Sequence, residues 1–320
     1  MMLAGFVVRR VASGIVFAFA VASLALLLAR LAPGDATTGD WATMSPDQRA
    51  ARRHELGLDV PLRTQYGRWL QGVAHLDLGQ SSLYRRPVAA LVGERALNTA
   101  LLAVVAAVVA TLIGIPLGRF SGAHQGALAR LVRLLSIATL SMPPLLGVLM
   151  LVFLAAYTGW LPVGGMTSAR LSGTAWIVDL ARHLPVPVLA LALPLAATLE
   201  RVQARSMAEA IGRPFVAASR ARGLSRDRTL RVHAWPVSLA PVLGLYGVLV
   251  GALFSGSFVV EIVTSWPGLG LLLFDALHGR DVWLTAGCGA AGAVALAAGT
   301  TFADVLHAMV DPRVLEGRDA

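Results

Sequence analysis

The feature that most limits how this chain can fold is a series of long apolar runs separated by polar, arginine-bearing segments. A membrane-spanning helix needs about 20 predominantly apolar residues to cross the hydrocarbon core of a bilayer. By this criterion the sequence predicts six spans, at residues 11–32, 99–118, 134–157, 184–199, 237–263 and 282–310. The run at 184–199 is short for a span. We expect Glu200, Arg201 or residues before Leu184 to complete it, with long side chains reaching the membrane interface.

The composition agrees with a bilayer as the solvent. Of the 320 residues 56% are hydrophobic and only 14% are charged, whereas about a quarter of residues are charged in soluble proteins. The net charge of +9 does not indicate a nucleic-acid partner, because the basic residues lie between the apolar runs and are not gathered on one surface. The sequence therefore predicts an all-α integral membrane protein with no nucleic-acid partner.

The polar segments divide the chain into four parts. The first apolar run exceeds the ~7–15 residues of a signal-peptide core, and no small-residue cleavage site follows it, which favours an uncleaved span. The predicted parts are an N-terminus with the first span (1–32), an external, periplasmic-side segment (33–98), a five-helix core with a cytoplasmic loop at 200–236 (99–310), and a cytoplasmic tail (311–320).

The arginines predict the orientation, because short loops rich in Lys and Arg stay on the cytoplasmic side. The loops at 119–133 and 200–236 carry three and eight arginines, whereas those at 158–183 and 264–281 carry two and one. The segment at 33–98 is itself rich in arginine, but long segments translocate largely regardless of charge. We therefore expect a multi-pass protein of the cell inner membrane with both termini in the cytoplasm.

Two short helices are expected in the external segment. Ser45 and Pro46 suit the N-cap and first turn of a helix that runs through Leu56. A second helix, resting near the membrane surface, is indicated by four residues at helical spacing: Tyr66, Trp69, Leu70 and Val73.

Several chemistries are excluded by missing residues. The sequence has no lysine, so it cannot form the phosphate-binding loop of a Walker A site, and any ATP and Mg²⁺ must be bound by partner subunits. Cys288 is the one cysteine, and the seven histidines show no metal-binding spacing, so no metal or other cofactor is expected on this chain. A G-x-S-x-G motif and an intramembrane pair of carboxylates are both lacking, which disfavours an intramembrane hydrolase. We expect a protein that is not an enzyme.

The segment at 205–236 is the most informative part of the sequence. It is long, basic and helix-forming, and it lies in the loop predicted to be cytoplasmic. Pro214 marks where a helix would begin and Gly223 where it would stop. Small residues and one bulky residue, Phe215, lie between them. Such a helix can fit the groove of a partner protein.

This segment resembles the cytoplasmic loop of ABC-importer permeases, in which Glu-Ala-Ala is followed by three residues, Gly, nine residues and Ile-x-Leu-Pro. Here Ala217-Ala218-Ser219, Gly223 and His233-Ala234-Trp235-Pro236 keep that spacing, although Ala217, Ser219, His233 and Trp235 depart from the pattern. The stretch FVAASRARGLS is similar to the form found in the dipeptide, oligopeptide and nickel branch of these importers. So are LGLDVPLRTQYGRWL, LDLGQSSLYRRPV, GWLPVGG and SWPGLG, and the terminal Asp311-Pro312-Arg313, which together extend the resemblance over most of the chain.

The resemblance implies the fold and the partners. It implies six transmembrane helices of the type I importer kind, a second homologous permease that forms a heterodimer with this one, two ATP-binding subunits, and an external substrate-binding protein that delivers a dipeptide or oligopeptide. In that family the loop is a coupling helix that docks on an ATP-binding subunit. The residues implied here are Phe215, Val216, Ala217, Ala218, Ser219, Arg220, Arg222, Gly223 and Leu224.

Residues of the fifth predicted span are candidates for helix packing or for the pathway. Gly247, Gly251 and Ser255 place small side chains along one face, which serves packing within this chain or contact with a second permease. Glu261 is ionisable, but its position just before Trp266 predicts a carboxylate that water reaches at the interface.

Two other functions stay open at this point. An ABC permease for another solute, such as nickel or a small peptide-like compound, would share these features. A self-contained secondary transporter is the other alternative. It would show interrupted spans in related halves and a buried ionisable coupling site, and it would leave the basic loop unexplained.

Overall fold

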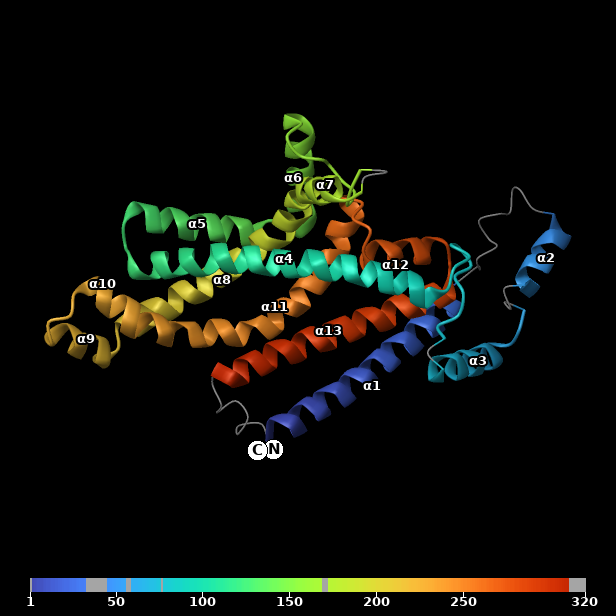
Figure 1. Cartoon of the computed structure of the whole chain (residues 1–320), viewed down its shortest axis with the longest axis horizontal. Helices are drawn as coiled ribbons and strands as arrows, with labels where there is room; N and C mark the ends of the chain where they lie inside the picture. Colours follow the sequence, from blue (N-terminus) through green and yellow to red (C-terminus); the bar gives the residue numbers. More distant parts are fainter. Residues whose placement is uncertain (1, 33–44, 56–58, 76, 169–171, 311–320) are drawn as a thin grey trace. The chain divides into compact units, whose positions relative to one another are not determined.

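The computed structural model describes residues 2–32, 45–55, 59–75, 77–168 and 172–310. Its elements follow one another as α1 (Met2–Leu31), α2 (Pro46–Glu55), α3 (Leu62–Ala74), α4 (Val88–Ala123), α5 (Ala127–Ser141), α6 (Pro144–Thr158), α7 (Thr174–His183), α8 (Pro185–Ile211), α9 (Pro214–Ala221), α10 (Arg226–Thr229), the π-helical turn η2 (Leu230–Ala234), α11 (Trp235–Val263), α12 (Leu269–His278) and α13 (Val282–Val310) (Figure 1). The described residues form no strand beyond one isolated bridge between Gln80 and Pro87. The all-α prediction is confirmed.

Among the residues that the structure describes, five helices are long and apolar enough to cross a bilayer: α1, α4, α8, the helix from α10 to α11, and α13. The apolar run predicted as a single span at 134–157 is instead divided between α5 and α6, whose axes differ by 107°. Met142 and Pro143 lie at the break, and Pro144 opens the second helix. The described part of the chain therefore has five candidate spans, or six when this bent pair counts as one.

Two segments predicted as loops are largely helical. α4 continues past Arg119 to Ala123, and α5 begins at Ala127, so only residues 124–126 remain of the expected loop at 119–133. Likewise α8 continues past Glu200 to Ile211, which completes the short apolar run as expected. Charged residues end the apolar runs here, but they do not end the helices, because arginine and glutamate are good helix formers.

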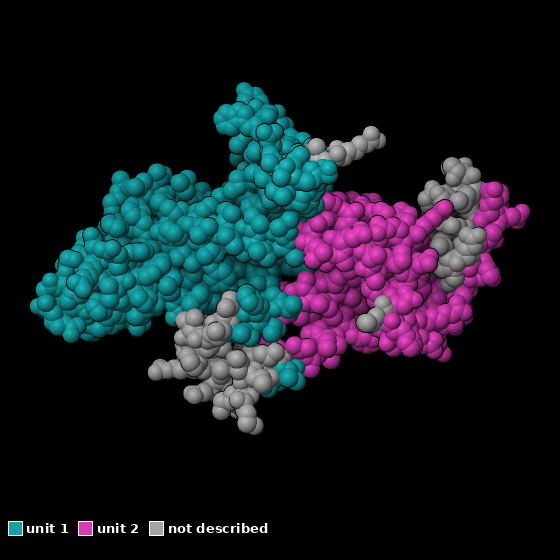
Figure 2. Space-filling view, viewed as in Figure 1, with its two compact units in different colours: residues 1–9, 100–266, 298–320 teal, residues 10–99, 267–297 magenta. Residues whose placement is uncertain are grey.

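The chain separates into two compact units (Figure 2). The first unit comprises residues 1–9, 100–266 and 298–320, and the second comprises residues 10–99 and 267–297. In the first unit α8 is the central helix. Of its most apolar stretch of 18 residues 56% is buried, whereas the figure for the corresponding stretch of α4 is 22%. Its buried face packs against α4, α6 and α11 around a core of aliphatic side chains that also includes Trp266.

The second unit contains the predicted external helices. α2 begins at the expected N-cap, where Gln48 N donates to Ser45 Oγ (3.3 Å) and Ser45 N donates back to the Gln48 side chain (2.9 Å). This reciprocal pair is a capping box. α3 is confirmed at the predicted spacing. Trp69 stacks on Phe19 of α1 with ring centroids 6.0 Å apart, and Tyr66 donates to Ser23 of α1 (3.1 Å).

Some predictions fall outside the described residues. These are the cytoplasmic tail at 311–320, with its Asp311-Pro312-Arg313 motif, the part of the external segment at 33–44, and Leu56 as the end of the first external helix.

Candidate functional site

The predicted coupling segment forms a short helix, α9, with well-defined ends. Pro214 occupies its first turn after Arg213, whose backbone is extended. At the other end Gly223 has φ +87°, which glycine adopts without the steric cost of a side chain. Gly223 N donates to Arg220 O (2.9 Å) and Leu224 N donates to Ser219 O (3.4 Å). These two bonds form a Schellman motif, so the start and stop predicted from the sequence are confirmed.

One face of α9 packs on its own unit. Val216 and Ser219 are only 3% and 1% exposed, and Ser219 Oγ donates to Phe215 O (2.8 Å). Val216 belongs to a small apolar cluster with residues from the ends of the neighbouring helices, Ala123, Met207, Ala210 and Ala234. These two predicted coupling residues are therefore buried within the chain itself, where they hold the helix in place.

The opposite face of α9 is exposed and nearly flat. Ala217, Ala218 and Ala221 lie on this side, because Ala221 follows the other two at four and three positions, and residues at these spacings are neighbours on a helix surface. Phe215, 38% exposed, lies at one edge, and Arg220 lies at the other. We call this surface the alanine face. Of the remaining predicted residues Arg222 is exposed, Gly223 forms the turn, and Leu224 is half-buried.

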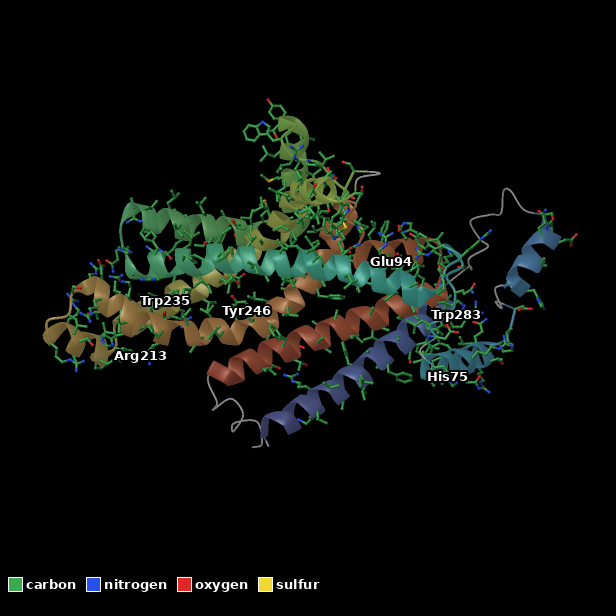
Figure 3. The ribbon with its side chains drawn as sticks, in the orientation of Figure 1. His75, Glu94, Arg213, Trp235, Tyr246 and Trp283 are labelled. Carbon is green, nitrogen blue, oxygen red and sulfur yellow. The ribbon has the colours of Figure 1, made fainter. Side chains whose placement is uncertain are left out.

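The return from α9 to the membrane helices is also fixed by hydrogen bonds. Ser225 caps α10 by accepting from Arg228 N (3.4 Å). Arg226 donates to Ala123 O at the C-terminus of α4 (3.1 Å), where a cation interacts favourably with the helix dipole. The π turn η2 then leads into α11. Arg213 and Trp235 mark this end of the first unit in Figure 3.

A buried polar layer lies about two to three turns from the end of α8 that carries α9. Ser121 of α4 donates to Glu200 of α8, and Gln203 of α8 donates to Ser238 of α11 (2.8 Å). Arg133 of α5 donates to Ser121 O (2.7 Å). Glu200 Oε2 and Gln203 Oε1 have no hydrogen-bond partner among the described residues. The layer therefore joins four helices through polar contacts.

Glu200 corrects one expectation from the sequence. Its side chain was expected to reach the membrane interface, but it is only 1% exposed. The reason is helical periodicity. Gln203 and Met207 follow Glu200 at three and seven residues, and all three lie on the buried face of α8. The spacing can be seen in the sequence. Because Glu200 and Gln203 are polar, however, a search for apolar residues at helical spacing does not find it.

A glycine stripe brings α4 against α8. Gly114, Gly118 and Gly122 recur every four residues on one face of α4. A Cβ atom at Gly118 would lie 2.5 Å from Glu200 O, and one at Gly114 would lie 2.5 Å from Ala196 O. Only glycine permits such close approach of two backbones. The four-residue repeat of glycine is a signal in the sequence from which this contact could have been predicted.

The small residues predicted on α11 have mixed environments. A Cβ at Gly247 would lie 3.8 Å from Asp304 Oδ1 of α13, so this glycine faces a helix of its own chain. Gly251 is half-buried, and Ser255 is exposed.

Glu261 is not the water-reached carboxylate that was predicted. It is 0% exposed, because the chain turns back after α11 and Trp266 N donates to Glu261 O (2.9 Å). Trp266 is itself 0% exposed and joins the core of the first unit. A tryptophan that marks the interface in sequence is here a core residue that covers the end of the helix.

No group of three or more His, Cys, Asp or Glu side chains that could hold a metal ion occurs within the described ranges.

Comparisons with known proteins agree with this architecture. The family described as binding-protein-dependent transport system inner membrane component matches residues 114–316, and the N-terminal part of such membrane components matches residues 2–88. The oligopeptide transport system permease protein AppB of Bacillus subtilis is 30% identical over 319 residues, which cover 98% of this chain and 99% of the relative. The dipeptide transport system permease protein DppB of Escherichia coli K12 is 30% identical over 333 residues, covering 97% and 98%.

The matched regions include the coupling segment, the polar layer and nearly all of the described helices. Such permeases are the membrane components of ABC transporters and are not themselves catalytic. This chain belongs to the family of binding-protein-dependent transport system inner-membrane components, and it is a multi-pass inner-membrane permease subunit of an ABC importer.

Proposed function

We propose that the chain forms, with a second homologous permease, the path by which a dipeptide or oligopeptide crosses the inner membrane. The names of the two relatives, an oligopeptide and a dipeptide transport permease, support a peptide as the solute. Two ATP-binding subunits bind ATP and Mg²⁺ and supply the energy, and an external binding protein delivers the peptide. Both termini and α9 lie on the cytoplasmic side, as the distribution of arginines predicts.

The observation that carries this proposal is the alanine face of α9. Small side chains let a partner surface approach the helix backbone closely, while Phe215 offers an apolar anchor at the edge. Arg220 and Arg222 lie at the rim, where guanidinium groups can pair with carboxylates of a partner. We infer that this face docks in a groove of an ATP-binding subunit.

The contacts on the buried face of α9 connect it to the membrane helices, so that a movement of the ATP-binding subunits can reach those helices. Val216 and Ser219 hold α9 on the ends of α4, α8 and η2, so a displacement of α9 acts on those helices directly. α8 in turn is locked to α4 by the glycine stripe. A rigid connection of this kind passes a stroke of the ATP-binding subunits to the helices that line the path.

The test is to fill the alanine face. Ala218→Trp places a large side chain where a partner must approach, which should lower ATP hydrolysis stimulated by peptide-loaded binding protein by about tenfold or more, the equivalent of ~1.4 kcal/mol of lost docking. The assay uses the full importer, purified with its ATP-binding subunits and second permease in lipid nanodiscs. Ala218→Ser, which keeps a small side chain, should retain stimulation.

A positional control separates docking from general damage. Ala127 is another exposed alanine in a region predicted to be cytoplasmic, at the start of α5 and outside α9. Ala127→Trp should leave stimulation unchanged. If the Ala218→Trp importer assembles and responds to binding protein like the wild type, α9 is not the coupling element.

A further inference from the structure

A cavity of about 540 Å³ opens on the first unit between α4 and the segment from α10 to α11. Its α4 wall is apolar at Leu112, Ile115 and Pro116 and becomes polar at Arg119, and His124 follows directly after α4. At about 1.5 Å of rise per residue, Arg119 lies about 10 Å beyond Leu112 along the helix. The cavity therefore has an apolar end and a basic end.

The opposite wall carries two charged side chains. Asp227 and Arg231 face the cavity from α10 and η2, and Trp235 follows at the start of α11. Arg119 Cζ lies 4.9 Å from the centre of the Trp235 ring, a cation–π contact that fixes the guanidinium against the wall. At the apolar end Thr111 of α4 shares a hydrogen bond (2.6 Å) with Tyr246 of α11, which lies outside the lining. Tyr246 is labelled in Figure 3.

The two arginines carry charge that the surrounding chain does not neutralise. Within the part of the chain that the structure describes, neither Arg119 nor Arg231 forms an ion pair with a carboxylate. Asp227 is the single acidic residue among the described residues of the lining, so the two arginines and this carboxylate together carry a net charge of about +1. An anion with one negative charge complements it.

The apolar end continues onto the surface of α4. Val104 and Val108 precede Leu112 at intervals of four residues, and the three side chains are 61%, 51% and 69% exposed. This exposed stripe leads directly into the cavity, because Leu112 belongs to both. A ligand that fits the whole surface has a long hydrocarbon tail and an anionic head.

We propose that this cavity binds one anionic phospholipid, with its phosphate between Arg119 and Arg231 and an acyl chain along the stripe from Val104 to Leu112. Guanidinium groups form strong charge-assisted hydrogen bonds with phosphate oxygens. The arginine distribution places the basic end on the cytoplasmic side, where basic pockets between membrane helices bind anionic head groups. Asp227 accepts a hydrogen bond from a head-group hydroxyl, which favours phosphatidylglycerol. Since α10 and η2 supply one wall, the lipid braces the return from α9 to α11.

Photo-crosslinking tests this site in the intact importer. The full complex is placed in phosphatidylcholine nanodiscs that contain a phosphatidylglycerol with a diazirine on its acyl chain. Adducts are then mapped by mass spectrometry. We expect them on the α4 peptide that contains Leu112, with labelling at least about fivefold above that from a matched phosphatidylcholine probe, the effect of about one arginine contact. Equal labelling by the two probes would contradict the proposal.

The variants assign the contacts. Arg119→Gln and Arg231→Gln should each lower phosphatidylglycerol labelling about fivefold, whereas Arg119→Lys keeps the charge and most of the labelling. Arg130→Gln is the matched control, because Arg130 is exposed and lies outside the cavity lining. Unchanged labelling in both cavity variants, with the complex assembled, would overturn the site.

Two further arms exclude other occupants. Millimolar inorganic phosphate should not displace the lipid; displacement would indicate an ion site. Leu112→Cys supplies an exposed thiol in a chain whose one natural cysteine is buried. Crosslinking of that thiol to the second permease in high yield would show that a protein covers the stripe, and the lipid proposal would be wrong.

Discussion

Two buried carboxylates, one in each unit, are held in opposite ways. Asp281 of the second unit is 0% exposed, and both of its oxygens are used: Ser81 Oγ (2.7 Å) and Leu83 N (3.1 Å) donate to one, and Leu284 N (3.0 Å) donates to the other. Glu200 of the first unit is 1% exposed, yet only one oxygen accepts a hydrogen bond, from Ser121. The other has no partner within the described residues.

This difference indicates that the contacts of Asp281 form a rigid junction between α13 and the loop before α4, whereas the contacts of Glu200 form a junction that can rearrange. Asp281 caps α13 and ties it to the loop before α4, so any displacement of that loop breaks several buried hydrogen bonds at once. In the layer of Glu200, unpaired acceptors already carry a free-energy cost, and a shift of α5 or α11 against the locked pair of α4 and α8 can bring them new donors. We expect the second unit to stay rigid while the layer behind α9 repacks during transport.

Isosteric substitutions of the two carboxylates give the largest expected contrast. In Asp281→Asn an NH₂ group replaces one of the two carboxylate oxygens and faces the donors that this oxygen accepted from. Those buried donors lose their acceptor, so the free energy of unfolding should fall by about 2–3 kcal/mol. In Glu200→Gln the oxygen still accepts from Ser121, and the new NH₂ replaces the oxygen that had no partner, so the change should stay below about 1 kcal/mol.

The chain carries a convenient probe for that measurement. Cys288 is the one cysteine in the sequence and is only 3% exposed, so a thiol-reactive dye reports its exposure on heating. The Asp281→Asn midpoint should lie at least about 5 °C below that of Glu200→Gln. Equal midpoints would remove the distinction between the two junctions.

The glycine stripe gives the next largest effect, and it tests whether α4 and α8 move as one body. In Gly118→Ala the new Cβ would lie 2.5 Å from Glu200 O, a backbone atom that cannot turn away, so we expect a loss of about 1–3 kcal/mol. Gly93→Ala is the matched control on the same helix, because nothing lies within 4 Å of its Cβ position. There alanine should be neutral or stabilising by up to about 1 kcal/mol. The same dye assay compares them, and a harmless Gly118→Ala would show that the two helices are not locked.

The ends of α9 could be predicted from the sequence because local residues set them. Pro214 fits only the first turn of a helix, and Gly223 adopts the positive φ that closes it. Which side of α9 is buried could not be predicted from the sequence. Val216 and Ala217 are similar small apolar residues in the sequence, and packing against Met207 and Ala234 decides that Val216 is the buried one.

The other differences have the same origin in tertiary structure. The two adjacent prolines, Pro143 and Pro144, announce a break in the third apolar run, but the 107° bend depends on how α5 and α6 each pack on α8. Glu200 and Glu261 are charged residues at the ends of apolar runs, where hydropathy places the membrane surface. They are buried because other segments of the same chain cover them, and a hydropathy profile does not show which segments pack together.

The smallest predicted effect concerns the hydroxyl of Tyr84, which adds a further hydrogen bond to the loop that Asp281 holds. Tyr84 lies in the loop that Asp281 fastens, and its hydroxyl donates to Asp275 (2.8 Å). Partial burial, followed by the hydrogen bond and the negative charge of Asp275, raises the pKa of Tyr84 to about 12. Because this folded-state pKa lies above the ordinary value of about 10, the contribution to stability is fully present below about pH 10 and is lost as the pH rises through about 12.

Tyr84→Phe should therefore lower the free energy of unfolding by about 1 kcal/mol at neutral pH, the usual worth of one hydrogen bond. The gap between wild type and variant should narrow as the pH rises from about 10 towards 12. Thermal unfolding followed by circular dichroism measures both, with Tyr157→Phe as the control, since Tyr157 is 81% exposed. A gap that stays constant with pH would mean that the hydroxyl of Tyr84 does not fasten the loop, and that Asp281 holds this junction without it.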